Sequence, residues 1–362
     1  MHYWIDDPST LTARIAAWGH VSSIALDTEF IRERTWWPQL ALVQLAAPGD
    51  AAALLVDPTI PGMADALRPL LADPAIVKLM HSASEDLQAL LHTCKIAPAP
   101  LFDTQIAAAL CGIGAGMGYQ RLVETLLGIA LPKDQTRSDW LRRPLSPAQC
   151  DYAADDVLHL HAIHTQLQER LHDLGRTPWL DEDSARLVTA IATDAPDPWP
   201  HLALRGAQDL EPDAQARLCR LLRWREATAR ASDRPKGWVL DNALALALAR
   251  RPPSNIHAFH SLLDATPKAP RRSRGELWQL LHAAPGGDQM DLPLAIAPDS
   301  AGKQRLKAMQ EAVAAHAERI GIDAGILASR RTLEALLDPR QRDTALTGWR
   351  RELLAPVLAP LI

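Results

Sequence analysis

The sequence lacks long apolar runs and contains little cysteine. No stretch of about 18 apolar residues occurs in the 362 residues, which argues against a membrane-spanning helix. The first residues, MHYWIDDPST, lack the basic start and apolar run of a secretory signal, so we expect a cytoplasmic protein. No Cys-x-x-Cys pair is present, which argues against structural zinc and favours buried, reduced thiols. The four cysteines are Cys94, Cys111, Cys150 and Cys219.

Charge is distributed unevenly along the chain. Residues 1–199 carry 14 Lys and Arg against 25 Asp and Glu, a net charge of −11. Residues 200–290 carry 14 against 9, a net of +5, and residues 291–362 carry 10 against 9, a net of +1. An acidic half joined to a basic segment fits a cation-binding site followed by a module that contacts phosphate. Ordinary solvated surfaces would give the same totals, so charge alone does not decide between these interpretations.

The first half of the chain alternates short apolar runs with helical patterns. Strands are predicted at 22–30, 40–46, 53–57 and 76–81, and helices at 63–72 and 84–92. This alternation predicts an α/β domain built on a mixed sheet. One long helix is expected to begin after Ser146, a favourable N-cap that is followed by Pro147, and to end near Gly175.

Beyond the proline-rich linker Asp194–Pro200, the patterns are helical only. Helices are expected at 213–231, within 241–253 and from Lys303 onward, with a basic loop at 269–275. The residues Val239, Leu240, Leu246 and Pro252 recur 87 positions later as Ile326, Leu327, Leu333 and Pro339. This match suggests a diverged repeat, although chance similarity between Ala- and Leu-rich helices would also produce it. The expected domains are 1–195, 205–288 and 296–362.

Two acidic residues, Asp27 and Glu29, lie at the end of a predicted strand. Side chains at positions i and i+2 point to the same face of a strand, so these carboxylates repel each other unless a cation lies between them. Oxygen ligands of this kind suit Mg²⁺ or Mn²⁺. The alternative is an exposed strand end with two solvated charges, which the pair alone does not exclude.

Three further residues complete a candidate site. Asp86 falls in the first turn of a helix that Ser84 could cap, where negative charge is favoured in any case. Tyr152 and Asp156 share one helix face and could hold a water molecule between them, although Asp155 is an equal candidate from spacing alone. Four carboxylates from one strand and two helices can hold two divalent ions about 4 Å apart, which would clamp a phosphodiester.

The order of these motifs resembles a known family. DTEF, HSASEDL with FDTQIAAAL, and YAADDV are similar to the three exonuclease motifs of the DEDD superfamily, and Tyr-x-x-x-Asp matches its tyrosine subgroup. Longer segments, LDTEFIRERTWWPQLALVQLA and DQTRSDWLRRPLSPAQCDYAADDVLHL, resemble the ribonuclease D family, and the similarity covers residues 1–175. LLRWREATARASDRPKGWVLDN resembles the helical HRDC domain of that family, and the final block resembles a second, diverged copy.

The resemblance implies a ribonuclease H-like nuclease domain, a mixed sheet flanked by helices, followed by all-α domains. It implies a 3′→5′ exoribonuclease that releases nucleoside 5′-monophosphates from RNA with a single-stranded 3′ end, such as transfer RNA precursors and other small structured RNAs. It assigns two ions, Mg²⁺ or Mn²⁺, to the four carboxylates, selects Asp156 over Asp155, and gives Tyr152 the role of orienting water. The metal ligands are Asp27, Glu29, Asp86 and Asp156. No obligate protein partner is evident.

Two alternatives are a DNA exonuclease and a binding protein without turnover. The chain has no polymerase or helicase segment, which weighs against the first, and all five essential positions are filled, which weighs against the second.

Candidate RNA-contacting residues are basic and aromatic, because a single strand is bound by neutralising phosphates and stacking bases. They are Lys133, Arg137 and Trp140 before the third motif, and Arg220 and Arg223 in the basic block. The alternative is a solvated loop in which Trp140 packs as a plug. Trp36–Trp37 is bulkier than the tyrosines that the resemblance implies there, which affects the shape of the neighbouring substrate groove. His81 is expected to be a packing residue, and Asp103 a helix cap.

Overall fold

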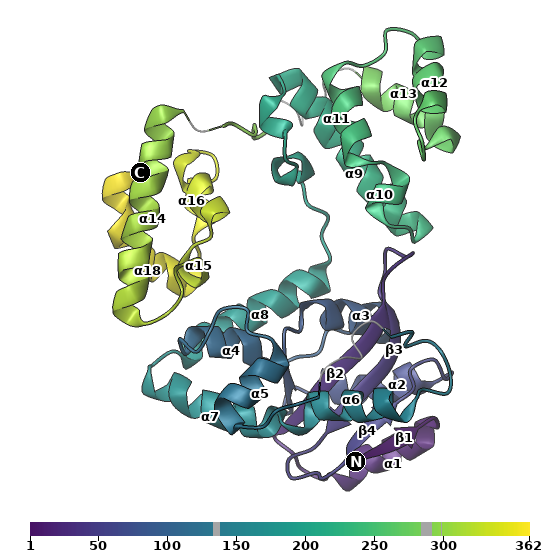
Figure 1. Cartoon of the computed structure of the whole chain (residues 1–362), viewed down its shortest axis with the longest axis vertical. Coiled ribbons are helices and arrows are strands. Elements are labelled where there is room, and N and C mark those ends of the chain that lie inside the picture. Colours follow the sequence, from purple (N-terminus) through teal and green to yellow (C-terminus); the bar gives the residue numbers. More distant parts are fainter. Residues whose placement is uncertain (133–137, 284–291, 298) are drawn as a thin grey trace. The chain divides into compact units, whose positions relative to one another are not determined.

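The computed structural model describes residues 1–132, 138–283, 292–297 and 299–362, which form two compact units (Figure 1). The first unit contains residues 1–31, 38–194 and 302–362, and the second contains residues 32–37 and 195–301. The domain boundaries expected from the sequence stay a prediction, whereas the contacts place the C-terminal block in the same unit as the sheet. Within the described ranges, no helix is long and apolar enough to cross a membrane. The four cysteines are unpaired thiols, and all except Cys111 are buried.

A mixed sheet lies at the centre of the first unit, as the sequence predicts. Its strands are β1 (His2–Ile5), β2 (Ser23–Ile31), β3 (Gln39–Ala46), β4 (Ala53–Val56), β5 (Val77–Met80) and β6 (Leu101–Asp103). They lie in the order β1-β4-β3-β2-β5-β6, and β3 is antiparallel to both of its neighbours while the other pairs are parallel. Strand β2 therefore lies inside the sheet, with hydrogen-bonded neighbours on both sides.

Helices cover both faces of this sheet because its strands alternate apolar residues between two cores. Ile24 and Leu26 of β2 pack in one core with helices α1 (Pro8–Ala17), α2 (Met63–Ala72) and α3 (Ser84–Cys94). Ala25 faces the other core, which contains residues of α4 (Thr104–Leu110), α5 (Tyr119–Leu127), α6 (Pro147–Leu158), α7 (Leu160–Asp173) and α8 (Thr177–Thr193). Helix α6 lies across the strands in Figure 1. Each residue of β2 is thus assigned to one face by its position.

The single long helix predicted after Ser146 is two helices. Ser146 caps α6 and forms a capping box with Gln149, and Pro147 occupies the first turn, as the sequence predicts. The helix ends at Leu158, and α7 begins at Leu160 after His159. No proline or glycine marks this break, so the sequence carries no local signal for it. The break allows α6 to pack on the sheet while α7 packs on α4 and α5.

The C-terminal block packs into the core of the first unit. It consists of α14 (Ser300–Ile320), α15 (Ala324–Leu327), α16 (Arg330–Leu337), α17 (Arg342–Ala345) and α18 (Gly348–Leu358). The guanidinium group of Arg176 donates to the carbonyl of Leu110 at the end of α4 (2.5 Å) and to that of Ile320 at the end of α14. A Cβ added to Gly112 would collide with the Gly321 carbonyl, so glycine is required at this approach.

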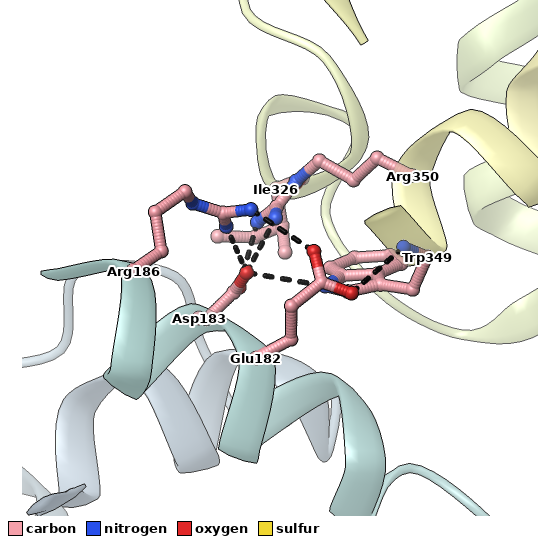
Figure 2. Close-up of polar contacts among 6 residues, drawn as sticks. All are labelled: Glu182, Asp183, Arg186, Ile326, Trp349 and Arg350. Carbon is pink, nitrogen blue, oxygen red and sulfur yellow. Dashed lines mark hydrogen bonds and ion pairs between the residues drawn. The ribbon is translucent and has the colours of Figure 1, made fainter. Parts of the chain in front are cut away.

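A buried ion pair joins α8 to α18 (Figure 2). Asp183, which is 7% exposed, accepts from both terminal nitrogens of Arg350 (2.7 and 2.9 Å) and from the indole nitrogen of Trp349 (3.1 Å). Arg186 also donates to it. The rings of Trp179 and Trp349 stack at 4.4 Å. Because the carboxylate is desolvated and shared by several donors, it ties the C-terminal block to the sheet domain.

The second unit is helical, as expected after the linker. Its helices are α9 (Pro212–Ser232), α10 (Lys236–Val239), α11 (Asn242–Arg250), α12 (Ile256–Ala265) and α13 (Arg274–His282). The basic segment expected to be a loop contains a 3₁₀ turn, Arg271–Ser273, and the start of α13. Helices α9, α10 and α11 have 21, 4 and 9 residues, and α14, α15 and α16 have 21, 4 and 8. This agreement in order and length supports the repeat hypothesis.

We predict that Asp183→Ala lowers the free energy of unfolding by about 3–5 kcal/mol, because it leaves Arg350 and the Trp349 indole without a buried acceptor. Urea unfolding of the full-length protein would measure the change. Asp181→Ala, two positions earlier and exposed, is the control and should change stability by less than about 0.5 kcal/mol. Equal effects of the two substitutions would contradict the role of the ion pair.

Candidate active site

Strand β2 places two carboxylates on one face of the sheet. Asp27 and Glu29 follow Ala25 at alternate positions, so they face the core that contains α6. The pairing of β2 with β3 shifts register between Glu29 and Phe30, directly after the second carboxylate. Both side chains are partly exposed. The strand end therefore presents an acidic pair at the rim of a buried sheet.

Helix α6 brings the third carboxylate to this pair. Its buried residues Ala153, Ala154 and Val157 pack in the sheet core, which holds Tyr152 and Asp156 partly exposed. Carboxylate oxygens of Asp27, Glu29 and Asp156 lie within 4.8 Å of one another. The group contains Asp156 and not Asp155, in agreement with the choice that the family resemblance implied.

Asp86 reaches the same strand from the opposite face. It lies in the first turn of α3, and its side chain is 8% exposed. Its Oδ1 accepts a hydrogen bond of 2.5 Å from the hydroxyl of Thr28, the residue between Asp27 and Glu29. The expectation that Ser84 caps α3 is wrong. The N-cap residue is Ala83, which has no side chain that can accept a capping hydrogen bond. Asp103 instead accepts from the backbone N–H groups of Ser82 and Ala83.

Burial is the largest cause that raises the pKa of all four carboxyl groups, and neighbouring acidic groups raise each of them further. Burial raises the pKa of Glu29 to about 9, with further increases from Asp156 and Asp86. Burial likewise raises the pKa of Asp156 to about 7 and that of Asp86 to about 6. The pKa of Asp27 is raised well above its usual value by burial and then by its acidic neighbours. Among the described residues, no lysine or arginine forms an ion pair with any of the four.

The donor set fits divalent metal ions. It offers carboxylate oxygens only, which are the ligands that Mg²⁺ and Mn²⁺ prefer. Closely spaced, partly desolvated carboxylates without a cationic partner are unstable as anions unless a cation joins them. The site is therefore built for cations.

Tyr152 lies beside Asp156 and is supported by Trp140. Burial, and then the negative charge of Asp156, Glu29 and Asp27, raise the pKa of the Tyr152 hydroxyl above its usual value. The Trp140 ring lies 6.1 Å from the Tyr152 ring and is 2% exposed. A ring buried in this way presents no free face to a base, which agrees with the alternative that Trp140 is a packing plug.

A polar network behind the site connects the second and third motifs. His81 bonds to the Thr104 hydroxyl (2.9 Å) and to the Met117 carbonyl (3.0 Å), so its expected packing role is confirmed. Asp103 caps α4, also as expected. The Tyr119 hydroxyl donates to the carbonyl of Asp155 (3.1 Å), one residue before Asp156. Sequence reasoning missed Tyr119 and Thr28; for Thr28, the signal was its position between two acidic residues.

The arginines expected to contact RNA bond to carbonyl groups within the second unit. Arg220 donates to Leu280 (3.2 Å) and Arg223 to Pro198 (2.5 and 2.9 Å), and both side chains are partly buried. These contacts fix neighbouring segments, and no acidic residue in the described part of the chain forms an ion pair with either arginine. Lys133 and Arg137 lie outside the described residues.

The Trp36–Trp37 pair belongs to the second unit. Trp36 is 8% exposed in its core, and the Lys236 ammonium lies 4.8 Å from its ring centre. One carboxylate oxygen of Asp233 accepts from the backbone N–H groups of Trp36 (3.0 Å) and Trp37 (2.9 Å). Trp36 is therefore a packing residue of the second unit, a role for which the sequence motif gave no signal.

Comparisons with known proteins agree with this site. Residues 2–172 match the family model described as 3′-5′ exonuclease, and residues 214–281 match the HRDC domain. A protein of Xanthomonas oryzae named ribonuclease D is 51% identical over 362 residues, covering 100% of this chain and 99% of the relative. One of Pseudomonas paraeruginosa with the same name is 36% identical and covers 98% and 96%.

A solved structure shares the whole architecture. The crystal structure of Escherichia coli RNase D, described as an exoribonuclease involved in structured RNA processing, has a TM-score of 0.85 and 32% sequence identity. The match covers 100% of this chain and 98% of that one. Sheet domain, helical unit and C-terminal block therefore all have counterparts in one solved relative.

We predict that the metal-free protein loses stability as pH rises from about 4 to 9. The folded-state pKa values of Glu29, Asp156 and Asp86 lie above their usual values of 4.5, 3.8 and 3.8, so the unfolded chain releases these protons first. Asp27→Asn removes one repelling charge and should make the decline shallower. Thermal unfolding with a chelator present would measure this, and Asp181→Asn is the exposed control. The prediction fails if all three proteins show the same pH profile.

Proposed function

The chain belongs to the ribonuclease D family, and on that premise we propose that its carboxylate group and one tyrosine carry out the reaction. It is a 3′→5′ exoribonuclease, which hydrolyses phosphodiester bonds one nucleotide at a time. The proposed residues are Asp27, Glu29, Asp86, Tyr152 and Asp156. The observation that carries this assignment is the convergence of three carboxylates, from β2 and α6, within 4.8 Å at the end of one strand.

Divalent metal ions are the cofactors of this family, and we propose two ions, Mg²⁺ or Mn²⁺, for this chain. Asp27, Glu29 and Asp156 would hold them, and Asp86 would complete the set from the opposite face of β2. When bound, such ions would activate a water molecule and stabilise the departing 3′ oxygen. The raised pKa values support this proposal, because they show how strongly the protein disfavours four bare anions here.

Tyr152 is proposed to orient the attacking water. Its raised pKa keeps the hydroxyl protonated at neutral pH, so the oxygen can donate to Asp156 and accept from a water. The spacing of four residues on α6 directs both side chains to one side of the helix. The buried Trp140 ring lies next to the Tyr152 ring. The water would thus be held by protein groups in line with the scissile bond.

RNA is the substrate class of the family, and we propose 3′ ends of transfer RNA precursors and other small structured RNAs for this chain. The second unit would supply phosphate contacts, since residues 200–290 carry a net charge of +5. Arg250 and Arg251 at the end of α11 are exposed and form no ion pair within the described part of the chain. We also propose a cytoplasmic location, which the unpaired cysteines support.

The two alternative functions have less support. The two relatives named above are ribonucleases by name, and the match covers almost their whole length, which disfavours a DNA exonuclease. The carboxylates are grouped and uncompensated, a costly arrangement that a binding protein without turnover would not need.

We predict that Asp156→Asn reduces the rate of 3′ trimming by more than about 100-fold, because a ligand of the proposed metal site is lost. Asp155→Asn is the matched control on the same helix, and it should leave the rate within about threefold. The assay is release of nucleoside 5′-monophosphates from a single-stranded RNA with magnesium present, with a DNA strand of equal sequence in parallel. Comparable losses in both variants would overturn the assignment of Asp156.

We predict that replacing Arg250 and Arg251 by Gln flattens the salt dependence of RNA binding by about 0.7 in log–log slope for each lost phosphate contact. Binding is measured in the Asp156→Asn background, so that the RNA is not degraded. Arg274→Gln is the control, because the charge of Arg274 is balanced by Asp264. An unchanged slope in the double variant would remove this pair from the proposed RNA surface.

A further inference from the structure

Thr28 lies between the two carboxylates of β2 but faces the other side of the sheet. Ile24, Leu26 and Phe30 occupy the same face and pack in the core that contains α3. Asp27 and Glu29 face the core that contains α6. The proposed site therefore uses both faces of β2: Asp156 comes from α6 on one face, and Asp86 comes from α3 on the other.

The contact between Thr28 and Asp86 is short and buried. The Thr28 hydroxyl donates to Asp86 Oδ1 at 2.5 Å, and the two residues are 5% and 8% exposed. Short hydrogen bonds to an ionised acceptor are among the stronger ones in proteins. Asp86 has no ion pair among the described residues, and the three-carboxylate group does not include it. Among the described residues, Thr28 is the side chain that donates a hydrogen bond to the Asp86 carboxylate.

We propose that Thr28 is a positioning residue, which uses one oxygen of Asp86 and leaves the other directed to the metal site. This inference rests on the proposed metal role of Asp86. Strand β5 pairs with β2 only from Ser23 to Ala25, so the edge of β2 beside Thr28 lies beyond that pairing, and the Asp86 carboxylate would reach the metal site past this edge. The Thr28 hydroxyl can reach the Asp86 carboxylate at this point, because Thr28 is the residue between Asp27 and Glu29 and its side chain projects to the opposite face of β2.

Threonine suits this role better than serine or valine. Its β-branch restricts χ1, so the hydroxyl is held in one direction without help from other groups. Valine has nearly the same shape but no donor, which would leave Asp86 Oδ1 buried and unsatisfied. Serine keeps the donor and loses the restriction. Comparing threonine, valine and serine at position 28 therefore distinguishes the effect of the hydrogen bond from the effect of side-chain shape.

The test is an isothermal calorimetric titration of the full-length protein with Mn²⁺ in the absence of substrate, which measures the affinity for the ion. Thr28→Val and Thr28→Ala should weaken the binding of one ion by about 10- to 100-fold, and Thr28→Ser should fall between them and the parent protein. Thr59→Val is the matched control, because the Thr59 hydroxyl donates to Asp57 Oδ1 at 2.6 Å away from this site. Its Mn²⁺ affinity should equal that of the parent.

The outcomes separate this inference from the proposed function. If Asp86→Asn weakens Mn²⁺ binding while Thr28→Val and Thr28→Ala do not, the positioning role is wrong and the metal role of Asp86 stands. If Asp86→Asn itself has no effect on Mn²⁺ binding, the proposed role of Asp86 fails. A double variant of Thr28→Val and Asp86→Asn should bind Mn²⁺ as weakly as Asp86→Asn alone, since Thr28 acts through Asp86. If the losses of Mn²⁺ affinity in the two single variants add up in the double variant, Thr28 does not act through Asp86.

Discussion

Repulsion among partly buried carboxylates is the constraint on which the site depends. Four acidic groups gather around the end of β2, and burial raises the pKa of every one of them. Such an arrangement opposes folding, so the rest of the first unit must hold the groups in place. The capping box of α6, the backbone contacts of Asp103 and the Tyr119 bond to the Asp155 carbonyl all serve this end. Rigid elements on both faces of the sheet keep the anions close until cations join them.

The sequence predicted the parts of the site that depend on local periodicity. The alternation of β2 placed Asp27 and Glu29 on one face, and the helical spacing paired Tyr152 with Asp156. The family resemblance was needed to choose Asp156 over Asp155, because spacing permits both. The position of Thr28 between two acidic residues was a signal, but its hydrogen bond to Asp86 could not be predicted, because that bond depends on which face of the sheet α3 covers. The break at His159 also escaped prediction, because tertiary packing and not a helix breaker produces it.

Arginine residues illustrate why counting charges does not locate a binding surface. Arg220 and Arg223 of α9 were expected to contact RNA, yet each donates to a carbonyl in the second unit, as Arg217 and Arg225 of the same helix also do. Guanidinium groups serve well here because they satisfy the carbonyls at helix ends and keep their charge. Arg143 in the first unit likewise donates to the carbonyls of Trp140 and Ala41, and it also pairs with the buried Asp57. The availability of a cation depends on its partners, which sequence composition does not reveal.

The position of the C-terminal block has a consequence for how the protein is made. The ribosome synthesises the sheet and α8 first, then the whole second unit, and only then the segment that contains Trp349 and Arg350. Until that segment emerges, the nascent chain exposes the Trp179 ring and the Asp183 carboxylate, which await their partners. Folding of the first unit therefore cannot finish during synthesis in the usual order from the N-terminus. A chain that ends early keeps an apolar and charged surface uncovered, a feature by which quality-control proteases could distinguish it from the finished enzyme.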